Sequence, residues 1–215
     1  NGSWYQGTFG DVKALAMKKW FNTNYHYIVP ELEDDTEIKI SGDKLWSEYA
    51  EAKSLGIEQT VVTGAYTILN FADVQEIRQP ADYVDEIVNA YKDLIESVKR
   101  ADRMDPFDEP ALVRDLSKED IALFHKIYEN ILPCKKTVEI LLQTYFGDVR
   151  DIYKDLTELP FDGIGRIFIE EKETVHLIEK VRIPEKRTKN CFFAGLVKNG
   201  KKYLEKIIMT DIKSV

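Results

Sequence analysis

The sequence predicts an α/β protein built from successive strand–helix units. Two observations lead to this prediction: short apolar runs with strand character recur along the chain, and a helical pattern follows each of them. Strand, helix and strand in this alternation are typical of parallel βαβ units, because parallel strands need a long crossover connection. Neither a sequence repeat nor a low-complexity linker divides the chain, so we expect a single domain over residues 1–215.

The strand candidates are short and apolar. In chain order they are residues 15–21, 60–69, 138–146, 164–169 and 191–197. A weaker candidate ends at Phe107, where Pro106 suits a central strand poorly because it lacks a backbone N–H donor.

Four segments carry apolar residues at the three- and four-residue spacing of an amphipathic helix. They cover residues 44–55, 80–100, 117–131 and 148–159. Ser117 begins the third with a pattern that resembles a capping box, with Asp120 three residues later, and Pro133 ends it. Gly56 follows the first segment, where a glycine suits the position after a helix.

The number of units bears on how the sheet is arranged. We count about six units, whereas a closed (β/α)8 barrel needs eight. A doubly wound open sheet also fits the alternation, but it normally carries a glycine-rich phosphate loop after its first strand. Gly163 and Gly165 begin a strand rather than a helix and do not form such a loop. A barrel that lacks some of its strands is therefore a strong candidate beside the open sheet.

Composition excludes several classes of function. The net charge of −8 argues against a nucleic-acid binder, because phosphate binding needs a basic face. No apolar run reaches the ~18 residues of a membrane span, so we expect no membrane association. Two distant cysteines, Cys134 and Cys191, favour a reducing cytoplasm over a disulfide framework. The three histidines show no metal-ligand spacing, so a zinc site made from them is not expected.

One long segment and five shorter ones carry a family resemblance. Residues 17–31, MKKWFNTNYHYIVPE, closely resemble the M-T-K-W-F-[DN]-T-N-Y-H-Y-x-V-P-E segment of the cobalamin-independent methionine synthase family. The shorter ones are similar to motifs that occur in the same order in that family. They are EAKSLG at 51–56, DEPALV at 108–113, TYFGD at 144–148, LPFDGIG at 159–165 and AGLV at 194–197.

The resemblance implies a fold and an activity. Members of the family have two facing (β/α)8 barrels, and the matched segments belong to the N-terminal barrel. The chain is then expected to be a (β/α)8 TIM-barrel type fold, incomplete, with about six βα units. The family moves a methyl group from 5-methyltetrahydrofolate polyglutamate to homocysteine, forming methionine. Its zinc activates the homocysteine thiol and belongs to the C-terminal half, so no cofactor is expected in this chain.

On this resemblance the chain supplies folate-tail contacts and scaffold, and is inactive alone. Departures from the family pattern at 62–67, 103–107 and 198–203 motivate the alternative, a non-catalytic barrel remnant that acts as a binding or scaffold protein. An incomplete barrel would leave strand edges unpaired, so self-association through these edges is also expected.

Two residues of the long segment are the candidate substrate-binding residues. Lys19 matches a family lysine that contacts the folate substrate, and a lysine suits a polyglutamate tail because it offers a point charge to carboxylates. Asn24 could bond a substrate amide, and the family motif supports that role. A solvated lysine and an Asx turn are the alternatives. The strand is placed at 15–21, with the loop opening at Asn22. We predict no catalytic residue and no metal ligand.

Four other polar residues follow predicted strands. Asp108 and Glu109 are consecutive, so their side chains should point to opposite faces and cannot share one proton. The turn fixed by Pro110 favours a structural role for them, capping or bonding a neighbouring loop, over acid–base chemistry. Tyr145 and Asp148 could line the same face, although Asp148 also suits an ordinary helix start.

Overall fold

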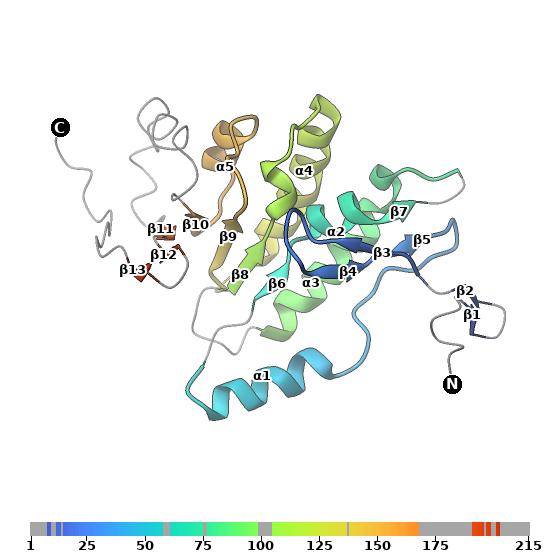
Figure 1. Cartoon of the computed structure of the whole chain (residues 1–215), viewed down its shortest axis with the longest axis horizontal. Coiled ribbons are helices and arrows are strands. Elements are labelled where there is room, and N and C mark those ends of the chain that lie inside the picture. The colour runs from blue at the N-terminus through green and yellow to red at the C-terminus, as the bar shows by residue number, and fades with distance from the viewer. Residues whose placement is uncertain are drawn as a thin grey trace.

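A computed structural model of the chain describes residues 15–57, 61–74, 77–98, 105–136 and 138–167, with short strands at 8–9, 12–13, 191–195, 197–198 and 201–202. The basic run at 186–189 and His176 lie outside the described residues. Figure 1 shows β6, β8, β9 and β10 side by side with helices beside them, whereas β1 and β2 lie apart near the N-terminus.

The central sheet is parallel and contains five strands. They are β6 (Val62–Thr63), β8 (Asp105–Asp108), β9 (Ile140–Thr144), β10 (Gly163–Ile167) and β11 (Cys191–Gly195), and their order in space is β11-β10-β9-β8-β6. All four neighbouring pairs run parallel. The predicted α/β architecture of parallel βαβ units is therefore confirmed, and the strands follow one another across the sheet in sequence order.

Three of the four predicted helices are confirmed. The first is α1 (Lys44–Ser54), followed by Gly56 at φ +82°. The second is the short turn η2 (Pro80–Tyr83) continued by α3 (Val84–Val98). The third is α4 (Lys118–Ile131), where Ser117 and Asp120 form the predicted capping box and η4 (Leu132–Cys134) ends the helix. For 148–159 the prediction is right only in part, because α5 covers Tyr153–Glu158.

The predicted strand at 60–69 is wrong beyond its first residues. The strand β6 ends at Thr63, and α2 (Ala65–Phe71) begins after Gly64. Ala65, Tyr66 and Leu69 are buried, as they would be in a buried strand. When an apolar run is buried on both sides, its hydrophobic residues show no period that distinguishes a strand from a helix. The apolar run at 60–69 was therefore read as a strand.

The strand placed at 15–21 is also corrected. The strand itself is β3 (Met17–Lys19), and it pairs antiparallel with β4 (His26–Ile28) instead of joining the central sheet. Residues expected to open a loop at 22–27 therefore turn back into a second strand at His26. Backbone bonds close the turn, with Trp20 N–H donating to Tyr25 O at 2.8 Å. This hairpin lies beside α2 in Figure 1.

Small pairings complete the described strands. The strands β5 (Glu31–Leu32) and β7 (Asp73–Val74) pair parallel. The pairs β1 (Thr8–Phe9) with β2 (Val12–Lys13), and β12 (Val197–Lys198) with β13 (Lys201–Lys202), are antiparallel. In β8, Pro106 does occupy a strand between two neighbours. The described pairing with β6 begins one residue later, at Phe107, so the missing N–H falls outside it.

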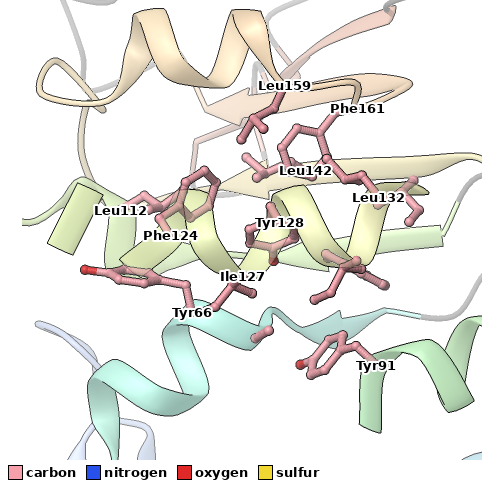
Figure 2. Close-up of a cluster of buried hydrophobic side chains, with 14 of the residues drawn as sticks. Tyr66, Tyr91, Leu112, Phe124, Ile127, Tyr128, Leu132, Leu142, Leu159 and Phe161 are labelled. Carbon is pink, nitrogen blue, oxygen red and sulfur yellow. The ribbon is translucent and has the colours of Figure 1, made fainter. Parts of the chain in front are cut away.

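The core fills the space between the sheet and its helices. Figure 2 shows its centre, where Phe124 and Tyr128 of α4 lie near Leu142 of β9 and Phe161. The Tyr128 and Phe161 rings have centroids 5.1 Å apart, and Tyr66 meets Phe124 edge to face at 5.9 Å. Each aromatic pair adds about 0.5–1.5 kcal/mol beyond simple burial. This packing fixes α2 and α4 on the same side of the sheet.

Within the described part of the chain, none of the helices is both long enough and apolar enough to cross a membrane.

Candidate functional site

The carboxyl ends of β6, β8 and β9 meet at one edge of the sheet because the strands are parallel. Thr63, Asp108 and Gln143 are in register across the three strands. Gly64 and Glu109 follow them directly, and backbone bonds continue the pairing: Gly64 N–H donates to Asp108 O at 2.6 Å, and Glu109 N–H donates to Gln143 O at 2.8 Å. In parallel α/β proteins, ligand sites lie at this edge.

Glu109 is fully buried and joins three elements. Its carboxylate accepts from the N–H groups of Tyr66 at 2.9 Å and Thr67 at 2.8 Å, both in the first turn of α2. It also accepts from the Thr67 hydroxyl at 2.5 Å and from the Tyr128 hydroxyl of α4. A carboxylate at the start of a helix satisfies N–H groups that have no partner within the helix. The predicted structural role of Glu109 is confirmed.

Burial and close packing surround this carboxyl group. Burial raises the pKa of Glu109 to about 7, although the bonds from Thr67, Tyr128 and Tyr66 oppose the rise. A Cβ atom at Gly64 would lie 2.2 Å from Glu109 Cδ, so only glycine leaves room for the side chain there. The position before α2 is therefore matched to Glu109 by size.

Asp108 points to the other side of β8, as the strand alternation predicts. The neighbouring Tyr145 side chain acts to lower the pKa of Asp108, and the Trp20 side chain of the hairpin acts to lower that of Tyr145. Oδ1 of Asp108 is buried and has no hydrogen-bond partner. Burial raises the pKa of Asp108 to about 6, and burial together with the neighbouring Asp108 raises that of Tyr145 to about 12.

Aromatic rings attach the hairpin to this edge. The Trp20 ring lies 5.4 Å from Phe71 of α2 and 5.6 Å from Tyr27, and Tyr27 stacks on Phe71 at 5.4 Å. A shallow hollow of about 160 Å³ opens beside them and is lined in part by Trp20, Thr63 and Thr67. Thr67 also bonds Glu109, so the hollow reaches the helix start that Glu109 holds.

Both sequence-predicted substrate residues lie on the hairpin. Lys19 ends β3 opposite His26, and its side chain is exposed. Asn24 is exposed in the turn between the strands. The structure therefore brings the two onto one element next to Trp20, while their contacts to a substrate stay a prediction. His26, the first residue of β4, is also exposed.

Of the other polar candidates, Tyr145 belongs to the site and Asp148 does not. Tyr145 belongs to the site through Asp108. Asp148 does not begin a helix, since α5 begins at Tyr153, and its carboxylate instead bonds the guanidinium of Arg150. Sequence reasoning missed the contact between the rings of Phe21 and Phe146, which joins the hairpin to the segment after β9; the signal in the sequence was that the KWF motif precedes a polar turn.

Metal ligands were not predicted in this chain. Among the residues that the structure describes, no group of three or more His, Cys, Asp or Glu side chains is arranged to hold a metal ion.

The parallel α/β architecture, with polar and aromatic side chains gathered at the carboxyl ends of the strands, defines the class: it is the layout of α/β enzymes. The model of a known family, described as "Cobalamin-independent synthase, N-terminal domain", matches residues 4–213. The chain therefore belongs to the cobalamin-independent methionine synthase family, within its N-terminal domain.

Relatives in streptococci agree with this assignment. The chain is 50% identical over 200 residues to the 5-methyltetrahydropteroyltriglutamate–homocysteine methyltransferase of Streptococcus sanguinis strain SK36. The matched region covers 92% of the chain and 26% of that protein. The protein of the same name in Streptococcus pneumoniae serotype 19F (strain G54) is 48% identical over 203 residues, or 93% of the chain and 26% of the relative. The chain thus spans about a quarter of the length of these relatives.

Proposed function

We propose that the chain is part of a methyltransferase that moves a methyl group from 5-methyltetrahydropteroyltriglutamate to homocysteine. The observation that carries the proposal is 50% identity, over nearly the whole chain, to a relative named for this reaction. The substrates come from the name of that relative. The chemistry of thiol activation would belong to another part of the longer enzyme, where zinc would lower the thiol pKa.

The proposed contribution of the chain is scaffold and folate-tail binding. A (β/α)8 barrel wall is supported by the strand order, because strands follow one another in sequence order in a barrel. A doubly wound sheet reverses its order at a switch point, and the five described strands show no such reversal. The two ends of this sheet, β6 and β11, are the edges through which self-association is proposed.

Lys19 and Asn24 are the proposed contacts to the substrate. A triglutamate tail carries several carboxylates, and an exposed lysine supplies a mobile positive charge that can follow them. Asn24 is exposed at the turn and offers both a donor and an acceptor. Because the tail is long and flexible, an exposed hairpin suits it better than an enclosed cavity.

Calorimetric titration of the chain with the triglutamate substrate tests this assignment. Lys19→Ala should weaken binding roughly three- to tenfold, the effect of one charge-assisted contact at an exposed site. Lys18→Ala is the matched control, since Lys18 is also exposed on the same strand but points to the opposite face. Equal effects of the two variants, or no effect of Lys19→Ala, would contradict the role of Lys19.

Exchange of the matched segment tests the proposed function itself. In the Streptococcus sanguinis relative, the 200 residues matched by this chain would be replaced by the chain's own sequence. We expect the purified chimera to transfer the methyl group to homocysteine. A chimera that folds, as judged by circular dichroism and a single unfolding transition, but does not form methionine would refute the proposal.

A cytoplasmic location is also proposed. Cys134 is a free cysteine in the structure. A free thiol suits a reducing cytoplasm.

A further inference from the structure

We propose that Arg114 is a further binding residue for the carboxylates of the substrate tail, held beside the β3–β4 hairpin by Asn70 and Phe71. This inference rests on the proposed function, because the ligand it names is the triglutamate tail of that substrate. Lys19 and Asn24 would then share the tail with a cation that comes from a different part of the chain.

Arg114 lies at the carboxyl edge of the sheet. It follows the short turn η3 (Pro110–Val113), which begins directly after Glu109 at the end of β8. Its side chain is exposed, and the guanidinium lies over the Phe71 ring of α2, with Cζ 5.7 Å from the ring centroid. A ring face attracts a guanidinium, whose N–H groups lie in its own plane and can still bond a ligand.

Phe71 connects Arg114 to the hairpin. The rings of Trp20 and Tyr27 both lie 5.4 Å from the Phe71 ring. Burial raises the pKa of Tyr27, and the charge of Arg114 opposes that rise, as expected for a cation near the hairpin. The hollow beside the hairpin is lined by these same three rings. A ligand that lies in the hollow therefore contacts the ring that carries Arg114.

Asn70 holds the guanidinium in place. Its Oδ1 accepts from Arg114 Nη1 at 2.8 Å, and its Nδ2 donates to the Tyr66 hydroxyl at 3.2 Å. Tyr66 is fully buried, and its hydroxyl donates to Asp120 at 3.2 Å. Because the single proton of that hydroxyl is used, Tyr66 can only accept from Asn70, which turns the amide oxygen toward Arg114. The position of Arg114 is thus set by bonds that begin in the core.

The charge of Arg114 has no carboxylate in ion-pair contact among the residues that the structure describes. Arg78 is the contrast, because it lies over the Tyr83 ring but also pairs with Glu86 at 2.8 Å. Asp120 feels the charge of Arg114 at longer range, while its own bonds go to the capping box and to α2. A guanidinium that is fixed by a neutral amide keeps its whole charge for a ligand.

The chemistry of Arg114 suits a glutamate tail. A guanidinium can bond both oxygens of a carboxylate, whereas a lysine acts as a point charge. Within the described part of the chain only Nη1 is bonded, to Asn70, so Nε and Nη2 can donate to a ligand. A tail with several carboxylates can meet Lys19 and Arg114 together, and a single glutamate offers fewer groups. We therefore expect Arg114 to raise the preference for the triglutamate form.

The test measures the affinities of the chain for the triglutamate and monoglutamate forms of the substrate by calorimetry. Arg114→Ala should lower the ratio of the two affinities roughly three- to tenfold, the range of one charge-assisted contact at an exposed site. Arg78→Ala is the matched control, since it removes an arginine that also lies over a ring but is already paired. It should leave the ratio unchanged. Circular dichroism and a single unfolding transition establish that each variant is folded.

Asn70→Ala tests the placement of the guanidinium. It keeps the charge of Arg114 but removes the acceptor that fixes it, so the ratio should fall less than in Arg114→Ala. The double variant should have the same ratio as Arg114→Ala alone, because Asn70 acts only through Arg114. Arg114→Lys keeps the charge without the planar fork and should restore only part of the preference. Additive losses from the two alanine variants would refute the positioning role of Asn70.

A second readout uses tri-γ-glutamate alone, which lacks the pterin and the methyl group. Its addition should shift the Nε–H resonance of Arg114, which is assigned by its loss in Arg114→Ala. The corresponding resonance of Arg78 should stay in place. Added salt should reverse the shift, because interactions between exposed charges are screened.

The outcomes separate the inference from the proposed function. If the parent prefers the triglutamate form and Arg114→Ala leaves the ratio unchanged, the inference is wrong and the function stands. If tri-γ-glutamate shifts the Arg114 resonance but the folded chimera described above forms no methionine, the carboxylate site exists and the proposed function fails. If the parent binds neither the triglutamate substrate nor tri-γ-glutamate, the inference is refuted.

Discussion

Substituting alanine for Gly64 tests how tightly the start of α2 is built around Glu109. The added Cβ would lie 2.2 Å from Glu109 Cδ and 2.3 Å from Oε1, closer than such atoms approach in proteins. The backbone itself would accept alanine, because Gly64 has φ −72° and ψ 155°. The outcome is therefore decided by the collision.

Two effects of opposite sign compete in this variant. Alanine restricts the unfolded chain and would stabilise the protein by about 0.4–1 kcal/mol. To make room, the fully buried Glu109 must shift and release part of its four hydrogen bonds, each worth about 1.5–3 kcal/mol above pH 7, where the carboxylate is charged. Losing two of them gives a net destabilisation of roughly 2–5 kcal/mol, or a fall in Tm of about 5–15 °C for a domain of this size.

Thermal and urea unfolding, followed by circular dichroism, measure the change. Gly165→Ala is the control, since its Cβ would meet Gln143 Cγ at an ordinary 3.5 Å, and we expect a change below about 1 kcal/mol. In a Glu109→Ala background the colliding atoms are gone, so Gly64→Ala should become neutral or slightly stabilising. Equal effects of Gly64→Ala in the two backgrounds would show that the collision with Glu109 is not the cause.

Three further predictions follow from charges and metal. The pKa of Glu109 is raised to about 7 in the folded state, so the stability that this group contributes falls as pH rises from about 4.5 to 7. Urea titrations should show that, relative to Glu109→Gln, the parent loses about 1–3 kcal/mol of unfolding free energy over that interval. Burial alone would lower the pKa of His125. The carboxylates of Asp155 and Glu129 have the larger effect, so the pKa is raised; Asp155 lies 2.7 Å from Nε2. His125→Gln should therefore cost roughly 0.2–1 kcal/mol below pH 6.5, a cost that disappears as pH rises through the folded pKa; a constant cost from pH 5 to 9 would contradict this. Elemental analysis of the purified chain should find less than stoichiometric zinc, and one bound zinc per chain would overturn the expectation.

Local patterns predicted those parts of the fold that local physics decides. The capping box at Ser117 and the glycine at Gly56 were found because each depends on residues within one helical turn. The opposite orientation of Asp108 and Glu109 was predicted because alternation along a strand is also local.

Other parts depend on contacts distant in sequence and could not be predicted in the same way. In α2, Ala65, Tyr66 and Leu69 are buried and Ile68 is half-buried, so the apolar run has no clear helical period. The start of the helix is secured by Glu109, more than forty residues later. The pairing of β3 with β4 depends on a turn whose residues also suit a loop. The ring contact between Phe21 and Phe146 joins segments that no motif connects.

The strand order has a consequence for how the protein is made. Each strand of the central sheet after β6 pairs with the strand that precedes it in the sheet, so the sheet can grow by one unit at a time while the chain is synthesised. The start of α2 is an exception to this sequential assembly. Its N–H groups find their acceptor only after Glu109 has emerged, and Glu109 receives its last donor from Tyr128 of α4. Residues 64–128 should therefore consolidate together, as one cooperative folding unit within a sheet that otherwise forms stepwise.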